Sequence, residues 1–249
     1  MDIANEFIAE NASFAEILRD ADLSTPVPTC PEWTLDQLMR HVGRGDRWCT
    51  QIVSSGEFVD PRTVSDGKPP PDRDGQIAWL REGPGALLDA VARTGADSQV
   101  WTFLGPRPAH WWIRRRLHET AVHRADAALA LDVDFDIAPA VAADGVGEYL
   151  ERVVARTGAP EVEQPLGEGQ SLHLHATDPG LGAAGEWMIR GLPDGLGVEH
   201  DHGKATAALR GRARDLLLAI VRRGDASQLG LEMFGDQAVW DTWLARTPF

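Results

Sequence analysis

A carboxylate and an imidazole stand four residues apart at Glu119 and His123, in a segment whose pattern predicts a helix. At about 100° per residue, the two side chains project from one helix face, about 40° apart. His118 and His123 are five residues apart and diverge by about 140°, so they are not expected to share one ligand. The segment therefore lacks the H-E-x-x-H pattern, in which two histidines hold zinc and the glutamate acts as a base. The Glu119/His123 pair therefore predicts two ligands of a metal site, and further ligands must come from elsewhere in the chain.

A mononuclear metal site needs a third protein ligand, and His41, on an earlier predicted helix, offers one. Zinc accepts nitrogen and carboxylate ligands, and three protein ligands leave a fourth position open for water or substrate, as in catalytic zinc sites. A Glu/His pair at this spacing, taken alone, more often belongs to a solvated helix face or a hydrogen-bonded core pair. Together with His41 and the motifs given below, Glu119 and His123 favour metal ligation.

Other polar residues around this pair have simpler interpretations. His118 is expected in the core or behind a ligand. Asp126 lies seven residues after Glu119, about 20° from it in projection. It could orient a ligating imidazole, and a surface or capping role fits equally well. Arg115 and Arg116 are expected to be surface charges.

Composition excludes several classes of function. The 249 residues are enough for one large or two modest domains. The net charge of −14 provides no basic face, which disfavours binding to nucleic acid or to an anionic membrane surface. No apolar run approaches the roughly 18 residues of a membrane span, and the N-terminus does not resemble a signal peptide. A cytoplasmic location is therefore expected.

The first half of the chain predicts a helical bundle. Ile3, Phe7, Phe14 and Leu18 form one apolar stripe at helical spacing. Thr34 and the glutamine three residues later fit a capping box at the start of a second helix. The predicted helices cover residues 3–19, 35–53, 76–94 and 110–131. Side chains that converge from four helices are the usual way in which bundles build metal sites.

The second half predicts a smaller α+β domain. The expected helices cover residues 138–156, 214–221 and 239–244, with a turn at residues 157–160. Alternating apolar residues predict a strand at residues 171–177, and shorter strands are expected at residues 186–189, 197–200 and 205–209. The simplest division places a helical bundle in residues 1–150 and the α+β domain in residues 151–249.

Four histidines in this second half form two pairs at alternate positions, His173 with His175 and His200 with His202. Such a cluster could indicate a second metal site. Alternating polar residues on the exposed side of a sheet predict the same pattern, and we favour that interpretation.

The two cysteines are too few for a disulfide framework or a cysteine-zinc site, so a metal must be held by histidine and carboxylate. Cys30 could be a nucleophile, but the sequence places no base beside it, and a packing role is favoured. Cys49 is expected in the core. Packing is also the simplest role for the tryptophans near these motifs, Trp33, Trp48, Trp111 and Trp112.

Several motifs, in order, resemble those of one family. They are VPTCPEWT at residues 27–34, LMRHV at residues 38–42, RLHETAVHRAD at residues 116–126 and ATAALRG at residues 205–211. Together they resemble the mycothiol-dependent maleylpyruvate isomerase family. The resemblance implies a DinB-like four-helix bundle followed by an α+β domain related to sterol-carrier-protein folds.

The resemblance also implies a site. The family's metal ligands correspond to His41, Glu119 and His123, with Zn²⁺ or another divalent metal and with mycothiol as the thiol cosubstrate. Arg223 stands at the position of the family's C-terminal arginine. It could pair with a substrate carboxylate, or it could be an ordinary helix-end arginine facing the helix dipole. Ala219 and Val221 depart from the family, which tends to have tryptophans there.

The function implied by the resemblance is a thiol-dependent isomerisation. A metal-activated thiolate adds to the cis double bond of maleylpyruvate, the new single bond rotates, and elimination gives the trans product. The alternatives are a mycothiol S-transferase acting on other electrophiles, hydrolysis by zinc-bound water, and a non-catalytic metal- or ligand-binding bundle. The expected partner is a small electrophilic molecule, and the expected assembly is a monomer or a homodimer.

Overall fold

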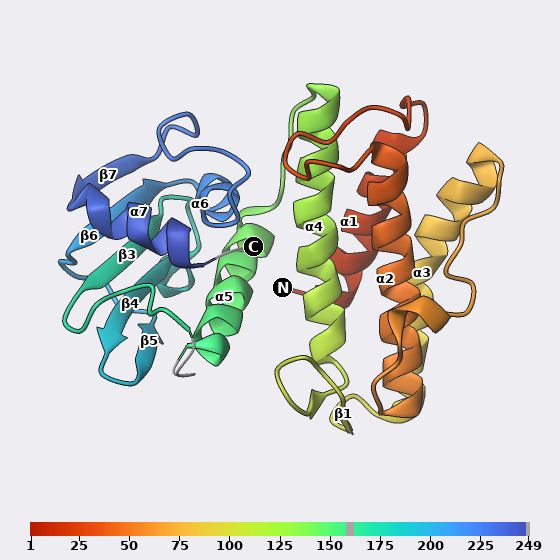
Figure 1. Cartoon of the computed structure of the whole chain (residues 1–249), viewed down its shortest axis with the longest axis horizontal. Coiled ribbons are helices and arrows are strands. Elements are labelled where there is room, and N and C mark those ends of the chain that lie inside the picture. Colours follow the sequence, from red (N-terminus) through yellow and green to blue (C-terminus); the bar gives the residue numbers. More distant parts are fainter. Residues whose placement is uncertain (158–161, 248–249) are drawn as a thin grey trace. The chain divides into compact units, whose positions relative to one another are not determined.

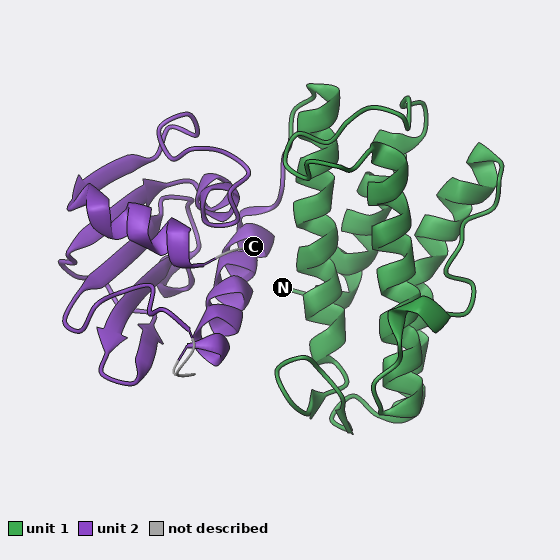
Figure 2. Ribbon diagram, in the orientation of Figure 1, with its two compact units in different colours: residues 1–135 green, residues 136–249 purple. Residues whose placement is uncertain are grey.

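The computed structural model describes residues 1–157 and 162–247, which fall into two compact units (Figure 2). Unit 1 comprises residues 1–135 and is helical, whereas unit 2 comprises residues 136–249 and combines a five-stranded sheet with helices. A helical domain followed by an α+β domain is therefore confirmed. The units divide between Phe135 and Asp136, whereas the sequence placed the division between residues 150 and 151. The difference arises because helix α5 packs with elements of unit 2.

Unit 1 is a bundle of four long helices, as predicted (Figure 1). α1 and α2 each pack against both α3 and α4, so the four helices close a ring. A short 3-10 helix and a two-stranded hairpin, which the sequence did not predict, occupy the connections before α3 and α4. The elements are α1 (Ile3–Leu18), α2 (Leu35–Ser55), η1 (Pro61–Thr63), α3 (Arg73–Thr94), β1 (Gln99–Val100), β2 (Arg107–Pro108) and α4 (Trp111–Leu131).

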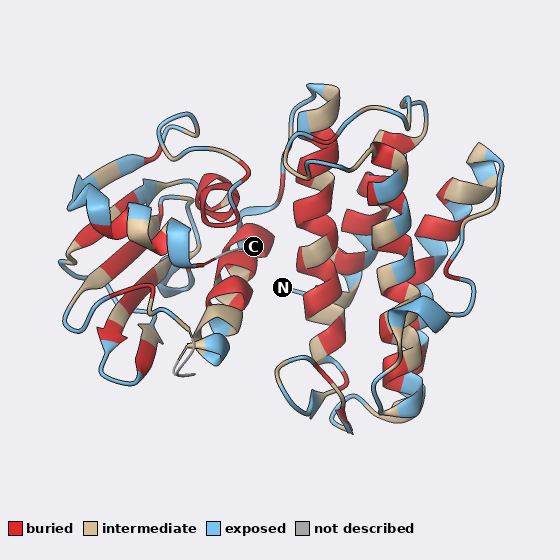
Figure 3. Ribbon diagram, viewed as in Figure 1, coloured by how far each residue is buried: buried red, intermediate tan, exposed pale blue. Residues whose placement is uncertain are grey.

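Helical spacing of apolar residues builds the core of this bundle (Figure 3). Phe7, Phe14 and Leu18 of the predicted stripe are fully buried, as a face directed at the other helices requires. The expected cap of α2 is also present. The Gln37 side chain accepts a hydrogen bond from the Thr34 backbone N–H at 2.8 Å, which satisfies one donor at the helix start.

A glycine sets how closely α2 approaches α3. Gly43 is buried against the indole ring of Trp79, and a Cβ atom at Gly43 would overlap that ring. Trp79 is itself held in place, because its Nε1 donates a hydrogen bond of 2.9 Å to the carbonyl of Asp66. The absence of a side chain at Gly43 therefore lets the ring fill the space between the two helices.

Unit 2 contains a five-stranded sheet with the strand order β5-β4-β3-β6-β7. β3 and β6 are parallel, and the other neighbouring pairs are antiparallel. Leu172, Leu174 and Leu209 are buried on one face of the two central strands. The elements are α5 (Pro139–Arg156), β3 (Ser171–Ala176), η2 (Gly182–Gly185), β4 (Glu186–Leu192), β5 (Gly195–Glu199), β6 (Ala207–Gly211), α6 (Ala213–Ile220), β7 (Glu232–Gly235) and α7 (Gln237–Arg246).

The sequence predicted the helices and most strands of this unit, but it missed β7. β7 is an edge strand of four residues with no buried side chain, so it has no apolar alternation to reveal it. The turn predicted at residues 157–160 lies largely outside the described residues. In the part of the chain that the structure describes, no helix combines the length and the hydropathy needed to cross a membrane.

Substitution of Gly43 by alanine should destabilise the bundle by about 1–3 kcal/mol, because the added methyl group forces the Trp79 ring or the helices apart. Chemical denaturation followed by circular dichroism measures the effect. Gly85→Ala is the matched control, since Gly85 lies within α3 with open space around a Cβ atom. That change should stabilise the bundle by about 0.5–1 kcal/mol through helix propensity. Equal stability of the Gly43 variant and the parent would contradict the packing argument.

Candidate metal centre

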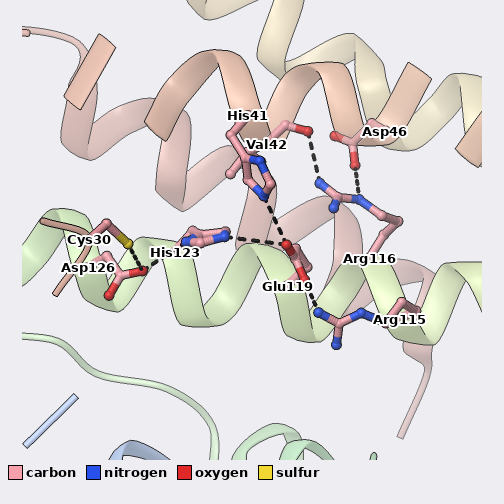
Figure 4. Close-up of polar contacts among 9 residues, drawn as sticks. All are labelled: Cys30, His41, Val42, Asp46, Arg115, Arg116, Glu119, His123 and Asp126. Carbon is pink, nitrogen blue, oxygen red and sulfur yellow. Dashed lines mark hydrogen bonds and ion pairs between the residues drawn. The ribbon is translucent and has the colours of Figure 1, made fainter. Parts of the chain in front are cut away.

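Three side chains from facing helices meet at one point in the bundle (Figure 4). His41 comes from α2, and Glu119 and His123 come from α4. The Oε1 atom of Glu119 lies 3.0 Å from Nε2 of His41 and 3.4 Å from Nε2 of His123. One donor atom from each residue lies within 4.8 Å of the other two. The structure therefore brings together the three residues that the sequence singled out as candidate ligands.

His123 is oriented by a buried carboxylate. Its Nδ1 lies 2.8 Å from Oδ2 of Asp126, which is fully buried. The other carboxylate oxygen of Asp126 accepts a hydrogen bond of 2.5 Å from the hydroxyl of Thr29. A proton on Nδ1 leaves the lone pair on Nε2, which faces Glu119, and this is the tautomer that a metal ligand needs. Asp126 therefore makes the contact that orients the imidazole of His123, and its burial excludes a surface role.

Glu119 is held by an arginine one turn earlier on α4. Its Oε2 atom forms an ion pair with the guanidinium of Arg115, while Oε1 faces the two imidazoles. Both side chains are largely buried, with 7% of Arg115 and 18% of Glu119 exposed. The expectation that Arg115 is a surface charge is therefore wrong. Its charge is placed inside the bundle, where the Glu119 carboxylate compensates it.

Arg116 is also buried, contrary to the same expectation, and it connects α4 to α2. Its Nε donates to Oδ1 of Asp46 at 2.8 Å, and its Nη2 donates to the carbonyl of Val42 at 2.8 Å (Figure 4). Asn11 of α1 donates to the second oxygen of Asp46 at 3.2 Å. Burial raises the pKa of Asp46, and the positive charge of Arg116 opposes that shift. A buried pair of this kind persists only where its remaining polar atoms are also satisfied.

The electrostatic environment keeps His41 neutral. Burial, together with the neighbouring His123, Arg116 and Arg115, lowers the pKa of His41 to about 3. Burial has this effect because an imidazolium ion loses hydration, and positive neighbours repel its charge. The neutral imidazole is the form that binds metal, so His41 can act as a ligand without first releasing a proton at neutral pH.

A cavity of about 370 Å³ opens beside His41. The half-buried Trp33 forms one wall, with its ring centroid 4.9 Å from that of His41 and 6.2 Å from that of His123. Positive side chains from α2 and from the connection to α3 line the same cavity. The lining residues are Trp33, Gln37, Arg40, His41, Arg44, Gly67, Lys68 and Pro69.

The sequence interpretation of Trp33 as a packing residue missed its place at this cavity. The preceding residue, Glu32, has a left-handed backbone conformation with φ of 65°. This conformation is uncommon for a residue with a side chain. It turns the chain between Cys30 and the start of α2. A proline-rich loop next to a candidate ligand helix is the only sequence signal of this arrangement.

The two cysteines differ in environment. Cys49 is buried, and burial raises the pKa of its thiol to about 12, which fits the expected core position. Cys30 is half-buried, and its Sγ lies 3.8 Å from Oδ2 of Asp126. Cys30 also belongs to a second possible ligand group with His123 and Asp126. That group shares His123 with the first.

The remaining candidates do not belong to the ligand group of His41, Glu119 and His123. His118 is buried, as expected. Trp48, Trp111 and Trp112 pack edge to face, with centroids 5.5 Å apart for Trp48 and Trp112 and 5.0 Å apart for Trp111 and Trp112, which confirms their packing role. Arg223 belongs to unit 2, where it follows α6, and its Nη1 donates to the carbonyl of Val221 at 2.7 Å.

Comparisons with known proteins agree with this architecture. Residues 4–128 match the family model of the mycothiol maleylpyruvate isomerase N-terminal domain, and residues 140–242 match that of the MDMPI C-terminal domain. A crystal structure of the mycothiol-dependent maleylpyruvate isomerase is 17% identical, with a TM-score of 0.55 over 90% of this chain and 89% of that chain. A crystal structure of a histidine-to-alanine mutant of such an isomerase is 15% identical, with a TM-score of 0.53 over 93% of this chain and 91% of that chain.

At these identities the solved structures establish a shared fold. None of the curated proteins matches the sequence. The two family models together cover most of both units and confirm the resemblance drawn from the motifs. The chain belongs to the mycothiol-dependent maleylpyruvate isomerase family, which is a family of enzymes.

Proposed function

We propose that His41, Glu119 and His123 hold a divalent metal ion, with Zn²⁺ as the best fit, and that the protein is a mycothiol-dependent isomerase acting on an anionic electrophile such as maleylpyruvate. The observation that carries this proposal is the convergence of two imidazole nitrogens and one carboxylate from facing helices. Family membership supports the thiol dependence.

The donor set fits zinc in type and in spacing. Zinc binds histidine nitrogen at about 2.0–2.1 Å, so donor atoms in a tetrahedral site lie roughly 3.3 Å apart. The distances of 3.0 and 3.4 Å from Glu119 to the two imidazoles are close to this value. Only three protein donors belong to this group, so one coordination position is left for a thiol or for water.

Zinc at this site would lower the pKa of the mycothiol thiol, whose reversible addition to a conjugated cis double bond permits rotation to the trans isomer. The protein's own residues prepare the site for this chemistry. Asp126 holds the proton on Nδ1 of His123, and Arg115 holds one oxygen of Glu119. The ring of Trp33 packs beside that of His41, with the two centroids 4.9 Å apart.

The cavity beside His41 supports an anionic substrate. Arg40, Arg44 and Lys68 line it, and among them the guanidinium of Arg40 pairs with Asp36 at 2.9 Å. Arg44 and Lys68 are therefore the best candidates to bind a substrate carboxylate, for which a guanidinium offers two parallel hydrogen bonds. Arg223 stays a prediction as a further carboxylate partner.

The defining experiment follows the conversion of maleylpyruvate with and without mycothiol. We expect formation of the trans isomer only with mycothiol, and the thiol should be recovered unchanged. His41→Ala should reduce turnover to the rate with free thiol and should weaken metal binding at this site by more than about 100-fold, since loss of a residue behind a ligand already costs about 10–100-fold. Circular dichroism checks that the fold is retained.

His110→Ala is the matched control, because His110 is an exposed histidine outside the cavity. It should keep the activity of the parent. A stable thioether product would instead identify an S-transferase, and turnover without any thiol would identify hydrolysis. A His41→Ala variant with full metal content and activity would refute the ligand assignment.

Asp126→Asn should reduce metal affinity by about 10–100-fold while leaving all three ligands in place, because the amide no longer fixes the tautomer of His123. Competition with a fluorescent zinc chelator measures this change. Asp89→Asn serves as the control, since Asp89 is exposed on α3. If both variants bind zinc as tightly as the parent, Asp126 has no orienting role.

Arg44→Ala should raise the KM for maleylpyruvate about tenfold, because a charge-assisted hydrogen bond to a substrate carboxylate is lost. The same variant should keep the KM of the parent for a neutral electrophile. Arg62→Ala removes an exposed arginine outside the cavity and should leave both values unchanged. An equal effect of Arg44→Ala on both substrates would show that Arg44 does not recognise the carboxylate.

A further inference from the structure

Half of the chain's eight histidines gather in unit 2 around Glu186, three at its carboxylate and one at its backbone carbonyl. His175 lies directly opposite Glu186 in the antiparallel pairing of β3 with β4, and His173 lies two residues earlier on the same face. His202 reaches Glu186 from the connection between β5 and β6. The alternation in sequence favours an exposed polar face of the sheet at these histidines. That interpretation is wrong for His173, which is buried.

The contacts to Glu186 are short and come from three imidazoles. Nε2 of His173 lies 2.6 Å from Oε2, Nδ1 of His202 lies 3.0 Å from Oε1, and Nε2 of His175 lies 3.5 Å from Oε1. The three ring centroids are 5.4, 5.6 and 5.9 Å from one another. The rings therefore surround the carboxylate at nearly equal spacing.

We propose that His173, Glu186 and His202 form a second transition-metal site, with His175 beside its open position. One donor atom from each of the three ligands lies within 4.8 Å of the other two. Imidazole with carboxylate is a donor set for Zn²⁺ and its first-row neighbours, whereas Mg²⁺ and Ca²⁺ select oxygen ligands. This site shares no residue with the centre between α2 and α4.

A cavity of about 450 Å³ gives this site an entrance and an open side. Glu186, His202 and His175 line it, together with polar residues that include Asp178 and Arg210. The three ligands differ in burial, with 6% of the His173 side chain, 15% of Glu186 and 71% of His202 accessible. A metal ion can therefore enter from the cavity, bind to His173 and keep one position directed at solvent or a small ligand.

Contacts on both carboxylate oxygens hold Glu186 in place, since Nε2 of His173 lies 2.6 Å from Oε2 and Nδ1 of His202 lies 3.0 Å from Oε1. The backbone carbonyl of Glu186 lies 2.7 Å from Nδ1 of His200, which anchors the segment that carries His202. A metal ion bound here would take the place of the imidazole–carboxylate contacts.

The site can be tested by zinc titration of the full chain against a fluorescent chelator. In the His41→Ala background, which weakens the first centre, we expect one tightly bound equivalent of zinc. Adding His202→Ala should weaken the binding of that equivalent at least 100-fold, and Glu186→Gln should have a similar effect. His202 is 71% exposed, so its replacement leaves the core intact. His110→Ala in the same background is the control and should retain the bound zinc.

The outcomes separate this proposal from the proposed function. The second site is supported if His202→Ala and Glu186→Gln each remove a bound zinc ion that His41→Ala leaves in place. This result would hold even if the first centre binds no metal. The proposal is overturned if the His41→Ala protein binds no zinc. It is also overturned if both unit 2 variants, folded by circular dichroism, bind zinc as tightly as their parent.

Discussion

The bundle of unit 1 encloses a complete ion pair, and the positions of its helices depend on keeping that pair satisfied. Arg116 and Asp46 are both buried, and each has a further partner, the Val42 carbonyl for the guanidinium and Asn11 for the carboxylate. An unpaired charge at either position would cost several kcal/mol. A sliding or rotation of α4 relative to α2 would break these contacts. The pair therefore fixes the register of the two helices that carry the candidate ligands.

Within that register, each candidate ligand is held by a different kind of contact. Asp126 orients His123 by a hydrogen bond, Arg115 fixes Glu119 by an ion pair, and Trp33 packs against His41. Three different contacts restrict the imidazoles and the carboxylate before any ligand is bound. Such preorganisation is what a reactive site requires, because its groups must hold a productive geometry without reorganising during the reaction. A solvated surface pair would show none of these supports.

Helical periodicity was enough to predict the four helices of unit 1 and to place Glu119 and His123 on one face, because both depend on local spacing. It could not predict the burial of Arg115 and Arg116. The partner of Arg116, Asp46, lies on another helix, so its position follows from tertiary packing. Arg115 pairs with Glu119 on its own helix, and local spacing alone does not show that both face the interior of the bundle.

The same limit applies elsewhere in the chain. The cavity position of Trp33 depends on a left-handed residue in an irregular loop. The burial of His173 depends on what covers its face of the sheet, which alternation along a strand does not specify. The strand β7 has no buried residue, so pairing with β6 is its only distinguishing property.

The parallel pairing of β3 with β6 has a consequence for the order in which the chain acquires its structure. β4 and β5 are consecutive antiparallel strands and can pair as soon as they are made, whereas Ser171 and Thr206 are 35 residues apart when β3 meets β6. Closing such a loop costs conformational entropy before the contacts that it permits are gained. Pairing β3 with β6 therefore costs more conformational entropy than pairing β4 with β5, and without that pairing the facing edges of β3 and β6 would present unpaired backbone groups.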